Sequence, residues 1–492
     1  MFNFYFSGHS FEYEARNTLR IFDLNTEYEI KDYSNFENNI GLGLFSILEI
    51  NCDEYIGYAQ LYFNKDLLYE AKISSNSLLM ERENENKLKK LVIVKSIYQV
   101  LSKYHKVKSN YGILTGVRPV KILSAAKDNG KTNEEINDIL INTYEISPEK
   151  VMLLWDVFKI EEKYINREIN DEYYNLYIGI PFCPSKCSYC SFTTYVKYKE
   201  IVLDKYVNTL VYETEKTIEL AISKNLKLHS IYIGGGTPSV LNVYQINLIF
   251  DTLKKYYNLS EIMEITFEAG RPDTITEEKL IALKNNCVNR ISINPQTMNQ
   301  HTLINIGRNH SIRDIKDKFA LARRVGFETI NMDIILGLPN EDEIDVKNTI
   351  NEILKLKPEN ITVHSLSYKT GSELKAKSNK QLTKDYELLS KMHETSDKRC
   401  TEDGYKPYYM YRQKNIKGNS ENIGYTVAGK ESIYNIVIIE EIETILACGA
   451  GVSSKIMLGN NNHETVYSFK GIEEYEIRIN EILEKKKILL NI

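Results

Sequence analysis

The sequence has no long apolar run and no excess of one charge. No apolar stretch reaches the roughly 18–20 residues that a membrane-spanning helix needs. The first residues, Met-Phe-Asn-Phe-Tyr-Phe, lack the basic start and apolar run of a signal peptide. We therefore expect no membrane insertion. Lysine plus arginine (62) nearly balances aspartate plus glutamate (67), for a net charge of −5. Since this leaves no general basic field, we expect no nucleic-acid partner.

Cysteine is also scarce, with seven residues in a chain of 492. An odd count in a chain of this size argues against a disulfide framework and favours a reducing compartment, so we expect a cytoplasmic protein. Internal repeats and low-complexity linkers are absent as well. Hydrophobic residues at 42% and charged residues at 26% are ordinary for a globular protein. The length predicts about two to four domains.

Two changes in pattern divide the chain. Residues 1–165 contain strand candidates followed by helical stretches, which predicts an N-terminal α+β accessory domain. Residues 166–375 alternate between strand and helix patterns. Residues 376–492 form a C-terminal mixed extension that we expect to cover the substrate. The strands expected in the first region are at 44–50 and 55–63. Three helices are expected: one at 87–104, one that begins at the capping-box pair Thr132 and Glu135, and one at 148–167.

The middle region predicts a barrel. Strands are expected at 176–180, 230–233, 263–267, 290–293, 329–335 and 361–366, with helical stretches at 205–224, 244–257, 277–285, 312–325 and 345–356. Repeated βα units predict a parallel sheet with helices outside. Six strands without a dinucleotide-binding glycine fingerprint favour a partial (β/α)6 barrel over a doubly wound sheet. In such barrels the reactive groups lie at the carboxyl ends of the strands.

Three of the seven cysteines follow the first barrel strand. Cys183, Cys187 and Cys190 lie in the run Ile-Pro-Phe-Cys-Pro-Ser-Lys-Cys-Ser-Tyr-Cys. Their C-x-x-x-C-x-x-C spacing places three thiolates on one short loop, enough for three corners of a cubane iron–sulfur cluster. A structural cluster normally has four cysteine ligands, so the open iron indicates chemistry. A zinc site is the alternative, but zinc usually takes a fourth protein ligand, often from a second C-x-x-C pair, and the other cysteines are unpaired in sequence.

A glycine run follows the second barrel strand. It reads Gly234, Gly235, Gly236 and Thr237, followed by proline. Glycines permit a tight turn and let a ligand approach the backbone closely. An ordinary turn is the alternative for the run alone, but its place one βα unit after the cysteine loop favours a binding role.

Polar side chains follow the later strands. Glu268 ends the third strand, Gln296 follows the fourth, Arg308 lies twelve positions later, Asp333 lies on the fifth and His364 on the sixth. Each alone has the alternative of a capped turn or a solvated loop. Together, two carboxylates, an amide and a guanidinium around one opening suit a zwitterionic ligand with a ribose. Carboxylates accept hydrogen bonds from hydroxyl or ammonium groups, and arginine binds a carboxylate with two parallel bonds.

These motifs resemble the radical S-adenosylmethionine (SAM) superfamily, and more narrowly its oxygen-independent coproporphyrinogen III oxidase-like branch. The coproporphyrinogen dehydrogenase type in this branch carries an extra N-terminal domain. The segments that carry the resemblance are residues 177–374, 407–415, 422–425, 449–451 and, in the N-terminal region, 114–121.

The resemblance implies two cofactors and their ligands. A 4Fe–4S cluster would be held by Cys183, Cys187 and Cys190, with S-adenosylmethionine on the open iron. Tyr177 would lie near the cofactor beside the cluster. Residues 234–237 would receive the methionyl amino end. The ribose and carboxylate would be bound by Glu268, Gln296, Arg308 and Asp333.

The implied activity is an oxidative decarboxylation. One electron from the cluster would cleave S-adenosylmethionine to a 5′-deoxyadenosyl radical, and two propionates of coproporphyrinogen III would become the vinyl groups of protoporphyrinogen IX in haem and porphyrin biosynthesis. The implied partners are a tetrapyrrole substrate and an electron donor such as flavodoxin or ferredoxin. The protein contributes placement and exclusion of water, while the cofactor carries the chemistry.

Two positions depart from the oxidase pattern. The oxidase branch has a further cysteine two residues after the third ligand, where this chain has Phe192. Its histidine two residues before the Ile-Pro-Phe-Cys run is replaced by Gly179. Phenylalanine at 192 also occurs in the related haem-chaperone branch. The alternatives are therefore a haem-binding chaperone-like protein, or a radical SAM enzyme acting on another tetrapyrrole.

The aromatic segment 405–412 has two interpretations. Tyr408, Tyr409, Tyr411 and Arg412 would suit a flat aromatic substrate with propionates. Alternating aromatics are also typical of an ordinary β-strand, which is the favoured interpretation.

Overall fold

The computed structural model describes residues 2–22, 27–32, 39–52, 54–79, 84–165, 172–192, 194–367, 384–413, 420–459 and 462–491. The chain divides into two compact units. The first contains residues 1–158, 380–390 and 411–421, and the second contains residues 159–379, 391–410 and 422–492.

The first unit is built on a five-stranded sheet in the order β2-β1-β3-β4-β5. Its elements are β1 (Phe2–Ser7), α1 (Glu12–Phe22), β2 (Tyr28–Ile30), β3 (Leu42–Asn51), β4 (Glu54–Phe63), β5 (Asp66–Ser74), α2 (Glu85–His105), α3 (Val120–Asp128), α4 (Asn133–Asp138), a π-helix (Ile139–Thr143) and most of α5 (Pro148–Glu161). Strand β1 pairs in parallel with β2 and β3, whereas β3, β4 and β5 are antiparallel. The expected α+β character of this region is confirmed.

Helix α2 packs tightly on β4 and β5. The contact depends on Gly57, because a Cβ there would lie 2.5 Å from the carbonyl oxygen of Val92. The capping box of Thr132 and Glu135 begins α4 as predicted. The helix expected at 148–167 ends at Glu161, and position 167 lies outside the described residues.

The second unit contains the predicted barrel strands. Its elements are β6 (Tyr173–Ile180), α6 (Glu200–Ser223), β7 (Lys227–Gly235), α7 (Val243–Lys254), β8 (Glu264–Glu268), α8 (Glu277–Asn285), β9 (Arg290–Ser292), α9 (Gln300–Asn305), α10 (Ile312–Val325), β10 (Thr329–Leu336), α11 (Glu343–Leu356), β11 (Asn360–Ser365), the later part of α13 (Lys384–Glu402), most of β12 (Lys406–Tyr411), β13 (Asn422–Thr426), α14 (Ile433–Glu440), β14 (Thr444–Cys448), β15 (Ser453–Met457), β16 (His463–Tyr467), α15 (Ile472–Ile477) and α16 (Ile479–Leu489). Short 3-10 turns at Pro238–Val240, Leu259–Glu261 and Pro272–Thr274 complete it.

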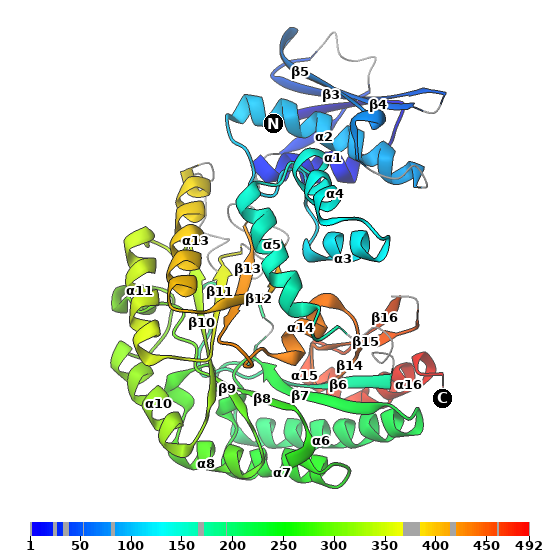
Figure 1. Ribbon diagram of the computed structural model, residues 1–492. Coiled ribbons are helices and arrows are strands. Elements are labelled where there is room, and N and C mark those ends of the chain that lie inside the picture. Colours follow the sequence, from blue (N-terminus) through cyan, green and yellow to red (C-terminus); the bar gives the residue numbers. More distant parts are fainter. Residues whose placement is uncertain are drawn as a thin grey trace. The chain divides into compact units, whose positions relative to one another are not determined.

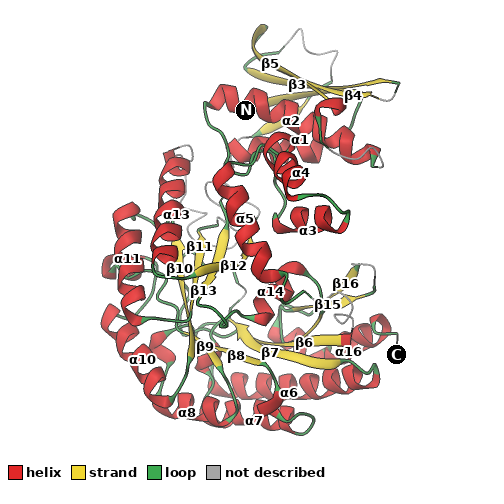
Figure 2. Cartoon of the chain, viewed as in Figure 1, coloured by secondary structure: helices red, strands yellow, loops and turns green. Residues whose placement is uncertain are grey.

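Strands β6 to β11 are parallel and lie in chain order within one sheet. Helices α6, α7, α8, α10 and α11 follow its outer face (Figure 1). The same arrangement of outer helices and inner strands is clear when the elements are coloured by type (Figure 2). The chain therefore has the predicted partial (β/α)6 barrel. Capping boxes fix the starts of α7, α10 and α11, at Asn242, Ser311 and Asp342, so each helix begins at a defined point after its strand.

C-terminal strands extend the barrel sheet at both edges. Strand β14 pairs in parallel with β6, and β13 pairs antiparallel with β11, which gives the order β12-β13-β11-β10-β9-β8-β7-β6-β14-β15-β16. Strands β13 and β14 thus cover the two sheet edges that six strands alone would leave unpaired.

A buried polar layer lies at the amino ends of the strands. The Glu264 carboxylate accepts hydrogen bonds from the Ser432 hydroxyl and from the Ile433 backbone N–H, both at 2.8 Å, at the start of α14. Arg290 lies 3.5 Å from Glu264 and donates to Asn360. This layer joins β8, β9, β11 and α14, so the opposite, carboxyl ends of the strands are held in fixed register.

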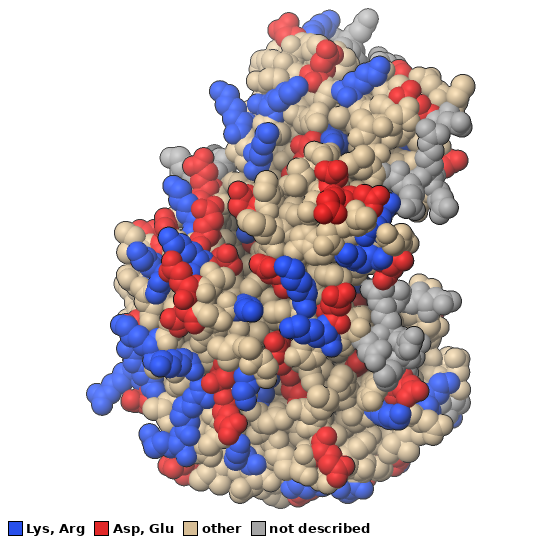
Figure 3. Space-filling model, viewed as in Figure 1, with Lys and Arg blue, Asp and Glu red and all other residues tan. Residues whose placement is uncertain are grey.

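Charges of both signs are interspersed over the face drawn in Figure 3. In the part of the chain that the structure describes, no helix combines the length and apolar character needed to cross a membrane.

Candidate cofactor site

The three predicted cluster cysteines lie on the loop that leaves β6. Two backbone hydrogen bonds, Cys183 N–H to Tyr195 O (3.0 Å) and Tyr195 N–H to Pro181 O (2.7 Å), fold this loop back on itself. Cys183 and Cys187 are buried, and Cys190 is half-buried. The loop's far side is fixed by the Ser188 N–H, which donates to Ile306 O at 3.1 Å. The thiols therefore sit on a loop held at both sides.

The glycine run packs directly against the first cysteine. A Cβ on Gly236 would lie 2.7 Å from the Phe182 carbonyl oxygen and 3.0 Å from the Cys183 sulfur. The neighbouring Thr237 hydroxyl lies 3.2 Å from the same sulfur. Gly235 has φ +115° and a Cβ there would meet the Ile180 backbone at 3.1 Å. The glycines are thus required for close packing of β7 on the cysteine loop.

Three thiols on one loop are the donor set of an iron–sulfur cluster, because each cysteine binds its own iron in a cubane cluster. Burial raises the pKa of the Cys183 and Cys190 thiols. A bound metal deprotonates its thiol ligands, so the cluster would offset this effect.

Glu268 lies at the end of β8, facing the glycine run. Its carboxylate accepts hydrogen bonds from the Tyr232 phenol at 2.6 Å and from the Gly235 N–H at 3.2 Å. Burial raises the pKa of Glu268 to about 7, the Tyr232 hydrogen bond opposes this rise, and the nearby Asp333 charge adds to it. The carboxyl group is therefore near its titration point at neutral pH.

The pKa of Asp333 is shifted in the opposite direction. Burial favours its neutral form, but the interactions with His364 and Asn331 outweigh burial and the pKa of Asp333 is lowered. Asn331 donates to it at 2.7 Å, and His364 Nε2 lies 3.8 Å away. The pKa values of the two carboxyl groups are thus shifted in opposite directions, so at neutral pH Asp333 is ionised and accepts hydrogen bonds, whereas Glu268 is near its titration point.

Gln296 and Arg308 have spare hydrogen-bonding capacity. Both are buried, and in the described part of the chain the Gln296 Oε1 and the Arg308 Nε have no hydrogen-bond partner. Gln296 has the left-handed φ of +68° and is held to β10 by backbone bonds to Asp333 and Ile335. Arg308 donates to the Tyr189 phenol at 3.1 Å, inside the cysteine loop. Unsatisfied buried polar atoms beside the loop fit a polar cofactor.

Tyr177 belongs to an aromatic stack inside the barrel. Its ring stacks on Tyr232 at 5.9 Å and on Tyr434 at 6.1 Å, and Tyr232 and Tyr434 stack at 4.4 Å. Burial raises the pKa of Tyr177 far above its usual range, so this phenol stays neutral. The stack adjoins Glu268 and provides an apolar wall beside the polar groups.

The structure thus links the predicted site residues to the cysteine loop by two routes. The glycine run and Thr237 lie between Cys183 and Glu268. Arg308 contacts Tyr189 of the loop and, through Asn294, is linked to Asp333 and Gln296. Their roles as cofactor ligands remain a prediction. Sequence reasoning did not assign roles to Tyr189, Tyr232, Arg271 or Tyr434. The place of Tyr232 in the site could have been inferred from the sequence, because Tyr232 lies two positions before Gly234 on the same strand and its side chain therefore lies on the same face. The sequence gives no such indication for Tyr434, because this residue belongs to a helix about two hundred positions after Tyr232.

The structure shows the surroundings of Phe192 and Gly179, the two positions that depart from the oxidase pattern. Phe192 is 65% exposed. A Cβ on Gly179 would lie 2.4 Å from Cγ1 of Val452. The space where a larger side chain would project from β6 is therefore filled by the segment between β14 and β15.

The aromatic segment is a buried strand, as favoured. Tyr408 and Tyr409 are buried in β12, and the Tyr409 ring packs on Gly424. Arg412, in the first unit, stacks on Tyr111 at 4.4 Å and donates to the Leu114 carbonyl oxygen at 2.5 Å. These side chains are engaged in packing within the protein. Positions 414 and 415 lie outside the described residues.

Comparisons with known proteins agree with this geometry. The family model of the Radical SAM superfamily matches residues 177–353. The Bacillus subtilis (strain 168) oxygen-independent coproporphyrinogen-III oxidase-like protein HemZ is 40% identical over 358 residues, which cover 71% of each chain. The heme chaperone HemW of the same strain is 38% identical over 191 residues, 39% of this chain and 49% of its own. Coproporphyrinogen III oxidase HemN from Escherichia coli has a similar fold, with a TM-score of 0.52 at 20% identity over 65% of this chain and 71% of its own.

The barrel and its cysteine loop define a radical SAM protein. The chain belongs to the radical SAM superfamily and, within it, to the oxygen-independent coproporphyrinogen-III oxidase-like proteins, close to HemZ. Members of this superfamily use a 4Fe–4S cluster and S-adenosylmethionine, which are therefore the cofactors of this chain.

Proposed function

We propose that the chain is a radical SAM oxidoreductase that decarboxylates two propionates of coproporphyrinogen III to form protoporphyrinogen IX without oxygen. The observation that carries the proposal is that two sets of contacts leave the cysteine loop, one reaching Glu268 and the other reaching Arg308 and Asp333. The similarity to HemZ over 71% of the chain supports the substrate class.

In this proposal Cys183, Cys187 and Cys190 bind the cluster. Gly236 permits the segment that follows β7 to lie against the Cys183 sulfur, which brings the glycine run beside the cluster ligands. Arg308 binds a carboxylate through its spare Nε, since its Nη atoms already donate to carbonyl oxygens and to Tyr189. When bound, the cofactors supply a 5′-deoxyadenosyl radical that abstracts hydrogen from the substrate.

The chain's own side chains orient the ligand and exclude water. The pKa values of Glu268 and Asp333 are shifted in opposite directions. The two carboxyl groups therefore suit the hydroxyl groups of a ribose, which both donate and accept hydrogen bonds. The stacked Tyr177, Tyr232 and Tyr434 close one side with rings, where water would otherwise quench a reactive species.

The proposal also includes partners and location. An electron donor such as flavodoxin or ferredoxin would reduce the cluster, and the seven cysteines, odd in number, suit a reducing cytoplasm. Both follow from the cofactor chemistry and composition.

A haem-binding chaperone-like protein is the second candidate. It is supported by the 38% identity to HemW over 191 residues and by Phe192 in the place of the oxidase's further cysteine. A radical SAM enzyme that acts on another tetrapyrrole is the third. The two enzyme candidates share the site described above and differ only in the substrate.

Mass analysis of the products decides among the candidates. The full chain is reconstituted anaerobically with iron and sulfide and incubated with dithionite, S-adenosylmethionine and coproporphyrinogen III. The proposal predicts 5′-deoxyadenosine together with a tetrapyrrole that has lost two carbon dioxide molecules. Release of 5′-deoxyadenosine only with another tetrapyrrole supports the third candidate. Tight haem binding without any 5′-deoxyadenosine overturns the enzyme proposal in favour of the chaperone.

The cysteine assignment has a matched control within the chain. Cys187→Ala is expected to abolish the cluster's visible absorbance and all 5′-deoxyadenosine release. Cys287→Ala removes a half-buried thiol in the turn before β9, away from the loop, and is expected to keep both. A full cluster in Cys187→Ala contradicts the assignment.

A further inference from the structure

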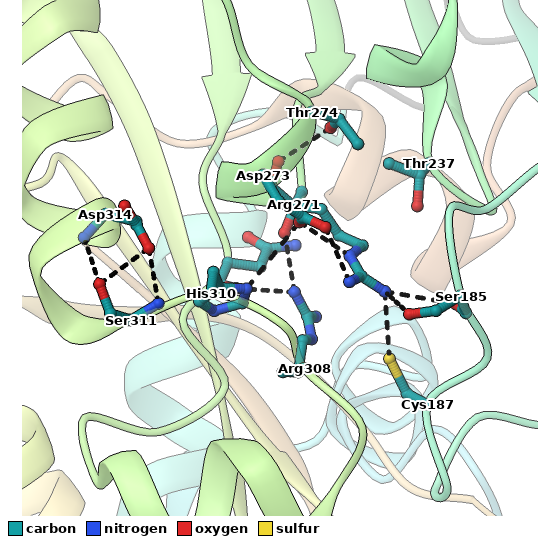
Figure 4. A network of polar contacts seen from close by, with 12 residues as sticks. Ser185, Cys187, Thr237, Arg271, Asp273, Thr274, Arg308, His310, Ser311 and Asp314 are labelled. Atoms are coloured by element: carbon teal, nitrogen blue, oxygen red, sulfur yellow. Dashed lines mark hydrogen bonds and ion pairs between the residues drawn. The ribbon is translucent and has the colours of Figure 1, made fainter.

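A buried arginine, to which the sequence analysis gave no role, lies against the cysteine loop. Arg271 follows β8 and is 3% exposed. Its guanidinium donates to the Ser185 hydroxyl at 2.8 Å and to the Ser185 carbonyl oxygen at 3.3 Å, and its Nη1 lies 3.9 Å from the Cys187 sulfur. Figure 4 shows the guanidinium between the cysteine loop and Asp273.

The other side of the guanidinium is held by Asp273. Its carboxylate accepts two parallel bonds, from Arg271 Nε at 3.0 Å and from Nη2 at 2.9 Å. His310 Nδ1 lies 4.0 Å from the same carboxylate, and burial lowers the pKa of His310 to about 4, so this ring is neutral at pH 7. Arg271 is thus a cation within 3.9 Å of the Cys187 sulfur, and Asp273 is its counter-charge on the far side. The buried Arg308, which donates to Tyr189 of the same loop, is a second cation whose charge acts on Cys187.

This arrangement is more than a loop anchor requires. Ser185 hydrogen bonds alone would hold the loop, and any neutral donor would supply them. A permanent charge in a buried site is costly unless it performs electrostatic work or is fully paired. Here the pairing lies on the side away from the sulfur, so a positive charge remains directed at the Cys187 sulfur in a low-dielectric environment, where charges act strongly.

We propose that Arg271 is a positioning residue of the iron–sulfur site, which fixes the loop through Ser185 and raises the reduction potential of the cluster through its charge beside Cys187, with Asp273 limiting that effect. The inference rests on the proposed function, because it requires the cluster to be bound by Cys187. Reduction adds one electron to the cluster, and a nearby cation stabilises the added negative charge. Charge and hydrogen bonds around the sulfur ligands are known determinants of such potentials.

The signs of the two charges give the test. Arg271→Met removes the cation and is expected to lower the midpoint potential by about 59 mV, a tenfold change in the one-electron equilibrium constant. Asp273→Asn removes the anion while preserving the shape of the side chain, and is expected to raise the potential. Arg271→Lys keeps the charge and is expected to remain closer to wild type than Arg271→Met. An anchor without electrostatic effect would not shift the two charge-removing variants in opposite directions.

The measurement is a dithionite redox titration of the reconstituted full chain without S-adenosylmethionine, followed by electron paramagnetic resonance of the reduced cluster. Iron and sulfide contents are measured beside it. The matched control is Arg313→Met, because Arg313 on α10 is 89% exposed at its side chain and its charge is screened by water and salt. No change in potential is expected for that variant.

The possible results distinguish a failure of the proposed function from a failure of the inference about Arg271. Wild-type protein that takes up no cluster overturns the proposed function and this inference with it. A wild-type cluster whose potential is unchanged by Asp273→Asn and Arg271→Met overturns the inference alone. If Arg271→Met fails to assemble a cluster, the direction of the shift in Asp273→Asn decides, and an unchanged or lowered potential there overturns the proposed role of charge.

Discussion

The Tyr232 phenol donates a 2.6 Å hydrogen bond to the Glu268 carboxylate. This hydrogen bond connects the aromatic stack of Tyr177, Tyr232 and Tyr434 to the carboxyl group that also contacts the glycine run. The apolar and the polar parts of the site are therefore in direct contact. Because the pKa of Glu268 is raised to about 7 in spite of this bond, burial dominates its ionisation.

The first prediction concerns the pH dependence of stability. The pKa of Glu268 rises from an ordinary 4.5 to about 7 on folding. The stability that this group contributes is therefore fully present below about pH 4.5 and is lost as the pH rises through about 7, when a buried charge must form. Glu268→Gln cannot ionise, so the wild type should become less stable relative to this variant as the pH rises, by up to about 3 kcal/mol.

Thermal unfolding of the protein without S-adenosylmethionine, followed from about pH 5 to about pH 8, measures this difference. Glu328→Gln serves as the control, since the Glu328 side chain is 85% exposed, and its difference from wild type should not follow the same course. Parallel pH profiles for wild type and Glu268→Gln would show that the carboxyl does not titrate in this range.

The second prediction concerns the contact between β7 and the cysteine loop. In Gly236→Ala the new Cβ would meet the Phe182 carbonyl oxygen at 2.7 Å and the Cys183 sulfur at 3.0 Å. Backbone displacement of this kind costs about 1–3 kcal/mol. Since the displaced segment carries a cluster ligand, iron and sulfide per chain should fall sharply after reconstitution.

Gly471→Ala is the matched control, because the nearest atom to its Cβ would lie 3.8 Å away and its φ is −76°. It should retain the wild-type iron content. Equal cluster content in Gly236→Ala would mean that the loop adjusts without loss of its ligand geometry.

The third prediction concerns recognition of the S-adenosylmethionine carboxylate. Arg308 uses its Nη atoms on the carbonyl oxygens of Gly270 and Asn294 and on Tyr189, which leaves Nε for a ligand. Lysine has one nitrogen and cannot serve all of these partners. Arg308→Lys should therefore raise the Kd for S-adenosylmethionine at least about tenfold, or about 1.4 kcal/mol.

Equilibrium dialysis against labelled S-adenosylmethionine measures this change in anaerobically reconstituted protein. Arg313→Lys on the exposed face of α10 provides the control for the same substitution. An unchanged Kd in Arg308→Lys with intact cluster would remove Arg308 from the binding site.

The barrel was predictable because its signals are local. Strand-like runs and helical stretches alternate in each βα unit, so the six parallel strands could be inferred from neighbours in sequence. The capping boxes that the structure shows at Asn242, Ser311 and Asp342 are signals of the same local kind. The same locality placed Cys183 and Glu268 at strand ends.

Long-range pairing was not predictable in the same way. Strand β14 pairs with β6 across about 270 positions, and a five-residue apolar run gives no sign of its partner. Arg271 stands between a glycine and a proline and has the sequence context of a solvated turn, yet it is 3% exposed. Burial of a charged side chain depends on segments that meet only in the folded chain.

The last prediction tests the replacement of the oxidase's histidine by Gly179. A Cβ at this position would lie 2.4 Å from Cγ1 of Val452, 3.4 Å from the Tyr177 ring and 3.5 Å from the Cys448 carbonyl oxygen. Gly179→Ala should therefore destabilise the protein by about 1–3 kcal/mol. Val452→Ala removes the closest clashing atom, so the double variant should lose less stability than the two single variants together, with a coupling of about 1–2 kcal/mol.

Equilibrium denaturation of the four proteins in this cycle measures the coupling. Strict additivity would mean that the backbone of β6 relieves the clash by itself, and that the Val452 side chain does not restrict position 179. A positive coupling has a further consequence, because a histidine at 179 would then need a smaller residue at 452 as well. The two positions would form one structural unit, and the difference from the oxidase pattern would lie in the β14–β15 segment as much as in β6.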